Sequence, residues 1–195
     1  MIITPLEIEG AWVAESPLWE DERGWFREWF KMSDIEKIID RKFDLEQANV
    51  SSSRINTVRG IHYSLAAKGQ AKWITCISGS IRDIVVDIRP KSETFGKWIA
   101  INLSGNSGKS VFYEEGLGHG FISLEENSTI TYLETSAYSP KDEYCINPFD
   151  NKLNIDWKIP ANECILSAKD QKAPGLNERL RQGKLPEKFI NEIKA

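Results

Sequence analysis

The stretch AKWITCISGSIRDIVVDIR, residues 71–89, decides the fold of this chain. It contains two apolar runs, 71–78 and 80–89, which are rich in Ile and Val and meet at Gly79. Side chains branched at Cβ favour strands, and glycine adopts the turn conformations that end them. The stretch therefore predicts two β-strands joined as a hairpin at Gly79.

Shorter runs of the same kind predict further strands at 97–103, 110–113, 120–124 and 129–135. Turn-forming clusters such as LSGNSG and EENS separate them, at a spacing typical of all-β sandwiches and barrels. Helical signals lie only at the flanks. They are a capping-box pattern from Ser33 to Glu36 and polar segments at 176–181 and 186–193. We predict an all-β jelly roll with short flanking helices.

Length and composition indicate one globular domain over residues 1–195, with a jelly-roll core at about 45–160. The net charge of −4 gives no general attraction for nucleic acid, so we expect none as a partner. No apolar run has the length of a membrane span, and the N-terminus lacks a signal-peptide pattern. We expect a cytoplasmic protein without a membrane partner. Of the three cysteines, Cys76 lies in an apolar run and is predicted to be a buried, reduced thiol.

Four of the seven tryptophans lie in the first thirty residues, at Trp12, Trp19, Trp25 and Trp29. Aromatic side chains of this kind cover a core or a subunit interface, or else stack on a ligand. We favour the first role. An aromatic N-terminal segment also suits a dimer that exchanges strands, so we expect a homodimer.

The chain has only two histidines, His62 and His119, and both lie in glycine-punctuated strands. Histidine is the side chain whose ordinary pKa lies nearest to physiological pH, which makes it the first candidate for proton transfer. We expect Arg59 and Lys72 to share a concave, cationic face with His62, with Lys72 on the neighbouring strand of the hairpin. Gly60 would leave room for a ligand at the backbone. Solvent-facing charge on strand edges is the alternative for the two cations.

Other polar residues have two interpretations each. Tyr132 and Tyr138 are either half-buried strand aromatics or phenols that face the cationic pocket, where positive charge would favour phenolate. Asp170 is a carboxylate next to Lys169, and alone it indicates nothing. Metal-binding β-barrels usually present a His-x-His pair, whereas position 64 is Ser, so we expect no metal.

Several motifs, in one order, resemble the dTDP-4-dehydrorhamnose 3,5-epimerase family. They are Asp21-Glu22-Arg23-Gly24, Gln47-Ala48-Asn49-Val50-Ser51, Arg59-Gly60-Ile61-His62-Tyr63, Ala71-Lys72, Asp87-Ile88-Arg89, Thr94-Phe95-Gly96-Lys97-Trp98, Gly118-His119-Gly120-Phe121 and Ile155-Asp156-Trp157. The resemblance covers nearly the whole chain. It implies a cupin-type jelly roll (double-stranded β-helix), a homodimer, no metal or other cofactor, and a dTDP-4-keto-6-deoxy-D-glucose substrate.

The resemblance also implies a role for each site residue. His62 would be the general base with Asp170 as its partner, Tyr132 the general acid on the opposite ring face, and Lys72 the group at the C4 oxygen. The remaining residues would bind substrate: Arg23 and Arg59 at the diphosphate, Glu28, Gln47 and Asn49 at the nucleotide, His119 at the hexose, Phe26 and Tyr138 by ring stacking, and Glu143 and Lys169 at further positions.

The sequence departs from the family pattern near these residues. Ser64 stands where Gln is usual, Trp73 follows Lys72 where an aliphatic residue is usual, and Leu133-Glu134-Thr135 replaces a Lys-Thr-Thr type run. The run Gly116-Leu117-Gly118-His119 also replaces the common Gly-Phe-Ala-His. No catalytic group is lost. Inversion at C3, at C5 or at both stays open, as do a keto-isomerase and a non-catalytic sugar-nucleotide-binding cupin.

Overall fold

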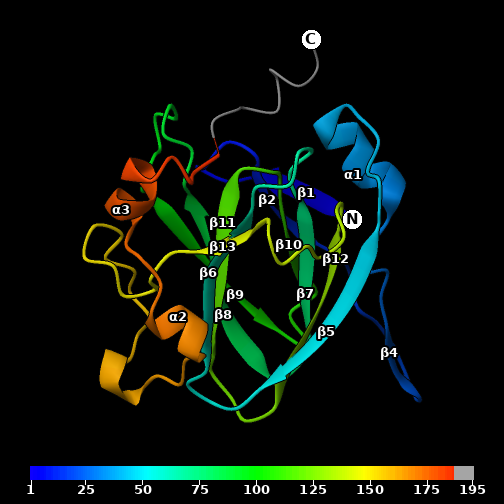
Figure 1. Ribbon diagram of the computed structural model, residues 1–195. Coiled ribbons are helices and arrows are strands. Elements are labelled where there is room, and N and C mark those ends of the chain that lie inside the picture. Colours follow the sequence, from blue (N-terminus) through cyan, green and yellow to red (C-terminus); the bar gives the residue numbers. More distant parts are fainter. Residues whose placement is uncertain (187–195) are drawn as a thin grey trace.

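The computed structural model describes residues 1–186 and consists mainly of β-strands (Figure 1). The strands are β1 (Ile2–Pro5), β2 (Ala11–Glu15), β3 (Trp19–Asp21), β4 (Gly24–Phe26), β5 (Gln47–Ser53), β6 (Val58–Ser64), β7 (Lys72–Ser78), β8 (Ser80–Asp87), β9 (Trp98–Ser104), β10 (Lys109–Tyr113), β11 (Leu117–Ser123), β12 (Ser128–Glu134) and β13 (Glu143–Cys145). The helices are α1 (Met32–Ile39), the short 3-10 helix η1 (Ala161–Glu163), α2 (Ala168–Gln171) and α3 (Leu176–Arg181).

The strands form two large antiparallel sheets and one small hairpin. The six-stranded sheet has the order β1-β2-β10-β7-β12-β5, and the five-stranded sheet has the order β13-β6-β11-β8-β9. Strands β3 and β4 pair only with each other. The chain passes repeatedly between the two large sheets, which enclose a common core. This arrangement confirms the predicted all-β jelly roll.

Three apolar clusters follow from the alternation of side chains along these strands. The inner cluster lies between the sheets and includes Ile74 of β7, Val85 of β8 and Ile130 of β12. Helix α1 and the aromatic ring of Trp73 cover the outer face of the six-stranded sheet. The segment after β13, including Leu176 of α3, covers the outer face of the five-stranded sheet. Figure 1 shows α1 and the pair α2 and α3 on opposite sides of the barrel.

The predicted hairpin at Gly79 is wrong, because β7 and β8 belong to different sheets. Strand β7 pairs with β10 and β12, whereas β8 pairs with β11 and β9. Gly79 has a φ of +69°, and a Cβ there would lie 2.7 Å from the Ser128 Oγ. The glycine thus turns the chain from one sheet to the other. Each run is buried on both faces and has two other strands as neighbours.

The flanking elements agree with the prediction in part. Helix α1 begins at Met32 after Lys31, which makes no side-chain cap, so the capping box expected at Ser33 is wrong. The Glu36 carboxylate instead accepts a hydrogen bond from the Phe43 backbone N–H at 3.3 Å. Helix α3 confirms the segment 176–181. The helix predicted at 186–193 falls almost wholly outside the described residues, and the strand predicted from residue 120 already begins at Leu117.

The N-terminal tryptophans divide into two groups. Trp12 stacks on Phe112 with 5.4 Å between ring centroids, and Trp29 packs on the same outer cluster. These two cover the core, as predicted. Trp19 and Trp25 lie in the β3–β4 hairpin and are each 49% exposed, so they do not cover the core of their own chain.

Candidate active site

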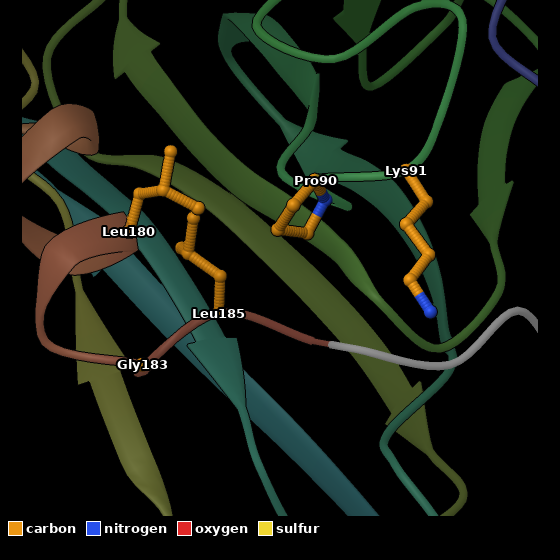
Figure 2. Close-up of a pocket in the computed structure, with 5 residues that line it drawn as sticks. All are labelled: Pro90, Lys91, Leu180, Gly183 and Leu185. Atoms are coloured by element: carbon orange, nitrogen blue, oxygen red, sulfur yellow. The ribbon is translucent and has the colours of Figure 1, made fainter.

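A cavity of about 170 Å³ between the two sheets gathers most of the predicted polar residues. Its lining consists of Ser51, Arg59, His62, Lys72, His119, Phe121, Ile130 and Tyr132. A larger cavity of about 310 Å³ lies elsewhere and is lined by Pro90, Lys91, Leu180, Gly183 and Leu185 (Figure 2). Aliphatic side chains dominate that larger cavity, and it brings no two proton-transfer groups together. We therefore assign the candidate site to the smaller, polar cavity.

His62 and Asp170 form a dyad in this cavity, with 2.7 Å between His62 Nε2 and Asp170 Oδ1. Asp170 is 2% exposed and lies in α2, where Ser167 Oγ accepts a hydrogen bond from the Asp170 backbone N–H. Burial alone would raise the pKa of Asp170. The hydrogen bond and charge of His62, together with Ser167, bring that pKa below its ordinary value. Asp170 is thus held as a carboxylate beside the imidazole.

The segment before α2 explains how a distant carboxylate reaches His62. Ile165 runs parallel to the start of β6 and forms an isolated bridge with Thr57. The Val58 N–H donates to the Ile165 carbonyl at 2.9 Å, and the Ile165 N–H donates to the Asn56 carbonyl at 2.9 Å. These bonds dock the chain against β6, and α2 follows within three residues.

Gly60 has a different role from the one expected. Strand β11 pairs His119 with His62 and Phe121 with Arg59, so β6 contains one extra residue between these pairs. Because of this bulge, Arg59 and His62 face the same cavity although they are three residues apart. A Cβ on Gly60 would lie 2.5 Å from the Cα of Gly120. The missing side chain therefore lets β11 approach, and it leaves no room for a ligand.

His119 belongs to a second dyad that the sequence analysis missed. Its Nε2 lies 2.7 Å from Asp83 Oδ1, and its ring stacks on Tyr113 with centroids 5.3 Å apart. Asp83 is fully buried. It interrupts the apolar run of β8 at an inward-facing position, between Ile81 and Val85 of the inner cluster. This acidic residue within an apolar run was the signal in the sequence that could have predicted the second dyad.

Lys72 enters the cavity from the sheet opposite His62 and not from a neighbouring strand, since β6 and β7 lie in different sheets. Its Nζ lies 2.9 Å from Glu134 Oε1 and 5.5 Å from the centroid of the Tyr132 ring. Burial and the charge of Glu134 raise the pKa of Tyr132. The positive charge of Arg59 lowers this pKa, as expected, but burial and Glu134 outweigh it, and the net shift favours the protonated phenol.

Three more predicted residues lie at one edge of the six-stranded sheet. Gln47 and Asn49 project from the edge strand β5, and Gln47 Nε2 donates to Asn49 Oδ1 at 2.9 Å. The backbone N–H of Tyr138 donates to Gln47 Oε1 at 2.8 Å, and the Tyr138 ring is largely exposed. These contacts make Gln47, Asn49 and Tyr138 one group.

Glu143 and Lys169 lie near the dyad. Glu143 is on β13 opposite Ser64, and burial raises the pKa of its carboxyl group. Its Oε1 is buried without a hydrogen-bond partner among the described residues. Lys169 precedes Asp170 in α2 and is exposed.

Arg23, Phe26 and Glu28 are not brought to the cavity of their own chain. Arg23 pairs with Asp21 in the exposed β3–β4 hairpin. Phe26 is 65% exposed and stacks on Trp19 with centroids 5.8 Å apart. In Figure 1 this hairpin, marked at β4, projects beyond the barrel.

Within residues 1–186 no group of three or more His, Cys, Asp or Glu side chains is arranged to hold a metal ion. No helix there is both long and apolar enough to cross a membrane. Cys76 is buried and free, as predicted, and burial raises the pKa of its thiol to about 11.

Comparison with known proteins adds independent evidence. The family model described as dTDP-4-dehydrorhamnose 3,5-epimerase matches residues 5–178. A curated protein of that name from Mycolicibacterium smegmatis is 40% identical over 187 residues, which are 95% of this chain and 91% of the relative.

Two crystal structures of Streptomyces proteins are also similar. NovW, a 4-keto-6-deoxy sugar epimerase from Streptomyces spheroides, superposes with a TM-score of 0.92 at 39% identity and covers 96% of this chain and 93% of its own. ChmJ from Streptomyces bikiniensis, a 3'-monoepimerase in complex with dTDP-quinovose, gives a TM-score of 0.89 at 39% identity, with 94% and 92% covered.

Proposed function

The chain belongs to the dTDP-4-dehydrorhamnose 3,5-epimerase family, and we propose that it inverts C3, C5 or both in a dTDP-4-keto-6-deoxyhexose during deoxysugar biosynthesis. It is an isomerase that acts on a carbohydrate. One observation carries the mechanism: His62, which pairs with Asp170, and Tyr132 line one cavity from opposite sheets. A sugar ring between the two sheets would present one face to each group.

His62 is the proposed general base. The C4 ketone acidifies the hydrogens on C3 and C5, because removal of either leaves an enolate whose charge lies on O4. His62 takes the proton, and the Asp170 carboxylate stabilises the resulting imidazolium, as in hydrolase triads. A positioned base of this kind contributes a rate factor of about 10²–10⁴.

Lys72 is the proposed electrostatic group at O4. Its ammonium group enters the cavity from the six-stranded sheet and is buried. A preorganised donor at a developing oxyanion lowers the barrier by about 3–4 kcal/mol.

Tyr132 is the proposed general acid. It returns a proton to the ring face opposite His62, and this inverts the carbon centre. Its raised pKa supports the role, because the phenol stays protonated at neutral pH. Exchange of one proton on each face needs no redox step.

The other cavity residues are proposed to hold the substrate. His119 donates a hydrogen bond to the hexose, and Arg59 binds the diphosphate at the cavity mouth. Gln47, Asn49 and Tyr138 bind the nucleotide along β5, and Glu143 and Lys169 complete the sugar side of the site.

A homodimer would bring the remaining residues into use. Arg23, Phe26 and Glu28 lie outside the cavity of their own chain, and the hairpin exposes Trp19, Trp25 and Phe26 together. Exposed aromatic clusters of this kind mark protein interfaces. We propose that each hairpin packs on a second copy and supplies these residues to the nucleotide site of that copy.

Proton exchange with solvent tests the proposed function directly. The enzyme is incubated with dTDP-4-keto-6-deoxyglucose in D₂O, and C3 and C5 are followed by NMR. We expect deuterium at one or both carbons and an inverted product, and exchange at one carbon alone identifies a mono-epimerase. A keto-isomerase would be recognised by its product. Absence of exchange at both carbons would refute the proposal.

A single variant tests the proposed base. We expect His62→Ala to abolish exchange while dTDP still binds, as measured by calorimetry, because His62 acts on the sugar and not on the nucleotide. Retained turnover in this variant would assign the base elsewhere.

A further inference from the structure

Glu134, which has no role in the mechanism above, occupies a central place in the site. It is the last residue of β12 and pairs in register with Gln47 on β5 and with Lys72 on β7. The three residues thus form one row across three neighbouring strands. Glu134 also shares the inner face of β12 with Tyr132, two residues earlier.

Hydrogen bonds connect this row into a continuous chain. Gln47 Nε2 donates to Asn49 Oδ1 at 2.9 Å, and Asn49 Nδ2 donates to Glu134 Oε2 at 2.9 Å. The other carboxylate oxygen, Glu134 Oε1, lies 2.9 Å from Lys72 Nζ. One carboxylate therefore joins the nucleotide edge of the sheet to the lysine proposed to act at O4.

The ion pair between Lys72 and Glu134 is buried. Glu134 is 4% exposed and Lys72 is 9% exposed, so neither charge is well solvated. A buried charge is stable only when it is paired and hydrogen-bonded, and the pair fixes the geometry of both partners. Without Glu134, the flexible Lys72 side chain would lose the group that holds its ammonium in place.

We infer that Glu134 is a positioning residue of the proposed epimerisation, which fixes the Lys72 ammonium for O4 and couples it through Asn49 to the bound nucleotide. This inference rests on the proposed function. It gives the nucleotide half of the substrate a physical connection to the reacting half. Binding of the nucleotide at β5 then orders the group that stabilises the enolate.

Glu134 also acts on the general acid. Its negative charge raises the pKa of Tyr132, in addition to the effect of burial. The other charged or titratable groups that act on this phenol or line the same cavity are Arg59, Lys72, Glu143, Tyr113, His62 and His119. Of the two carboxylates that raise the pKa of Tyr132, Glu134 has a larger effect than Glu143. Its removal therefore lowers that pKa.

The first experiment compares Glu134→Gln with the wild-type enzyme over a range of pH. We expect kcat to fall roughly 10- to 100-fold, the effect of a misplaced catalytic group. We also expect the alkaline fall in kcat to move to lower pH, because Tyr132 loses its proton earlier. Glu115→Gln is the matched control: Glu115 is a buried carboxylate that pairs with Arg41 and does not line the cavity. In that control the alkaline limb should stay at its wild-type position.

The second experiment breaks the chain one step earlier and does not alter a buried charge. If Asn49 only binds the nucleotide, Asn49→Ala should raise KM and leave kcat unchanged. We expect kcat to fall as well, because Glu134 loses the donor that orients it. An alkaline limb that does not move in Glu134→Gln, or a kcat that is unchanged in Asn49→Ala, would overturn the inference.

These experiments distinguish a failure of the proposed epimerase function from a failure of the proposed role of Glu134. If the wild-type enzyme exchanges no proton with the keto sugar, the proposed function fails. If it does exchange, and either of the two overturning results is obtained, the function stands and the role of Glu134 is refuted.

Discussion

His62 and His119 lie directly opposite each other on β6 and β11, and each contacts a buried aspartate at 2.7 Å. The partners differ in origin: Asp83 lies on the next strand, β8, whereas Asp170 comes from α2. The two dyads are alike in geometry, but their proposed roles differ: His62 with Asp170 acts as the base, and His119 with Asp83 binds the substrate.

The matched substitutions Asp170→Asn and Asp83→Asn test this difference. We expect Asp170→Asn to lower kcat by about 10²–10⁴, since the imidazolium loses its stabilising charge and the imidazole its tautomer. Asp83→Asn should mainly raise KM. Steady-state kinetics on the keto sugar measure both, and an equal loss of kcat in the two variants would contradict the assigned roles.

Gly60 allows a prediction about stability at a single position. Its φ is +131°, and a Cβ would collide with the backbone of Gly120 at 2.5 Å. We expect Gly60→Ala to lower the free energy of unfolding by more than about 2 kcal/mol, because strain and a backbone collision add.

Gly24 is the control for that substitution. It has a similar φ of +125°, yet no atom lies within 4 Å of the position of its Cβ. Gly24→Ala therefore carries the backbone strain without the collision. Urea denaturation should show the smaller loss for Gly24→Ala, and equal losses would mean that the contact with β11 is unimportant.

At the scale of elements, the turn after β8 is held by a buried carboxylate. Asp87 accepts hydrogen bonds from Arg89 Nε at 2.9 Å and from Arg89 Nη2 at 2.8 Å, and also from Ser92 and Thr94. Burial would raise the pKa of Asp87, but these bonds bring it below its ordinary value of 3.8. The carboxylate thus stabilises the fold above that pH, and the stabilisation is lost as the pH falls through the lowered pKa.

We expect Asp87→Asn to lower the free energy of unfolding by about 3–5 kcal/mol at neutral pH, since the buried Arg89 guanidinium loses its ion pair with Asp87. The difference from wild type should shrink as the pH falls below 3.8 and through the lowered pKa of Asp87, because the wild-type carboxylate then takes up a proton. Urea denaturation at neutral pH and at acid pH measures it. The exposed pair of Asp156 and Lys158 supplies the control, and Asp156→Asn should change little. A difference that stays constant with pH would contradict the role of Asp87.

The elements also show what the sequence could predict. Apolar runs and turns gave the strands and the jelly roll, because alternation and glycine act locally. Strand pairing could not be predicted locally. The runs on either side of Gly79 have the pattern of a hairpin, but β7 and β8 pair with other strands and lie in different sheets. The bulge at Gly60 was invisible for the same reason, since it depends on the register with β11.

The pairing of His62 with Asp170 could be predicted only through the family resemblance. His62 and Asp170 are 108 residues apart, and no local pattern connects them. Asp83 and Glu134 looked like ordinary strand residues, although each interrupts an apolar inner face. A buried acidic residue at an inward position is the signal that would have found both.

At the scale of the whole molecule, the exposed hairpin predicts shared active sites. If Arg23 serves the second copy, a dimer of one Arg23→Ala chain and one His62→Ala chain contains one intact site. Random exchange of equal amounts should therefore restore about a quarter of wild-type activity from two weak enzymes. Activity after mixing and co-refolding measures this, with each variant alone as the control. No recovery, or a monomer of 22.2 kDa in sedimentation, would rule out the exchange.

The distance in sequence between His62 and Asp170 has a consequence for the newly made chain. A ribosome delivers β1 to β13 before α2 appears, so the barrel can begin to assemble while His62 still lacks its carboxylate partner. The imidazole gains its orienting partner only when the segment at Ile165 has docked beside β6. The proposed acid–base dyad can therefore form only late in synthesis, after the strands of the barrel have been made.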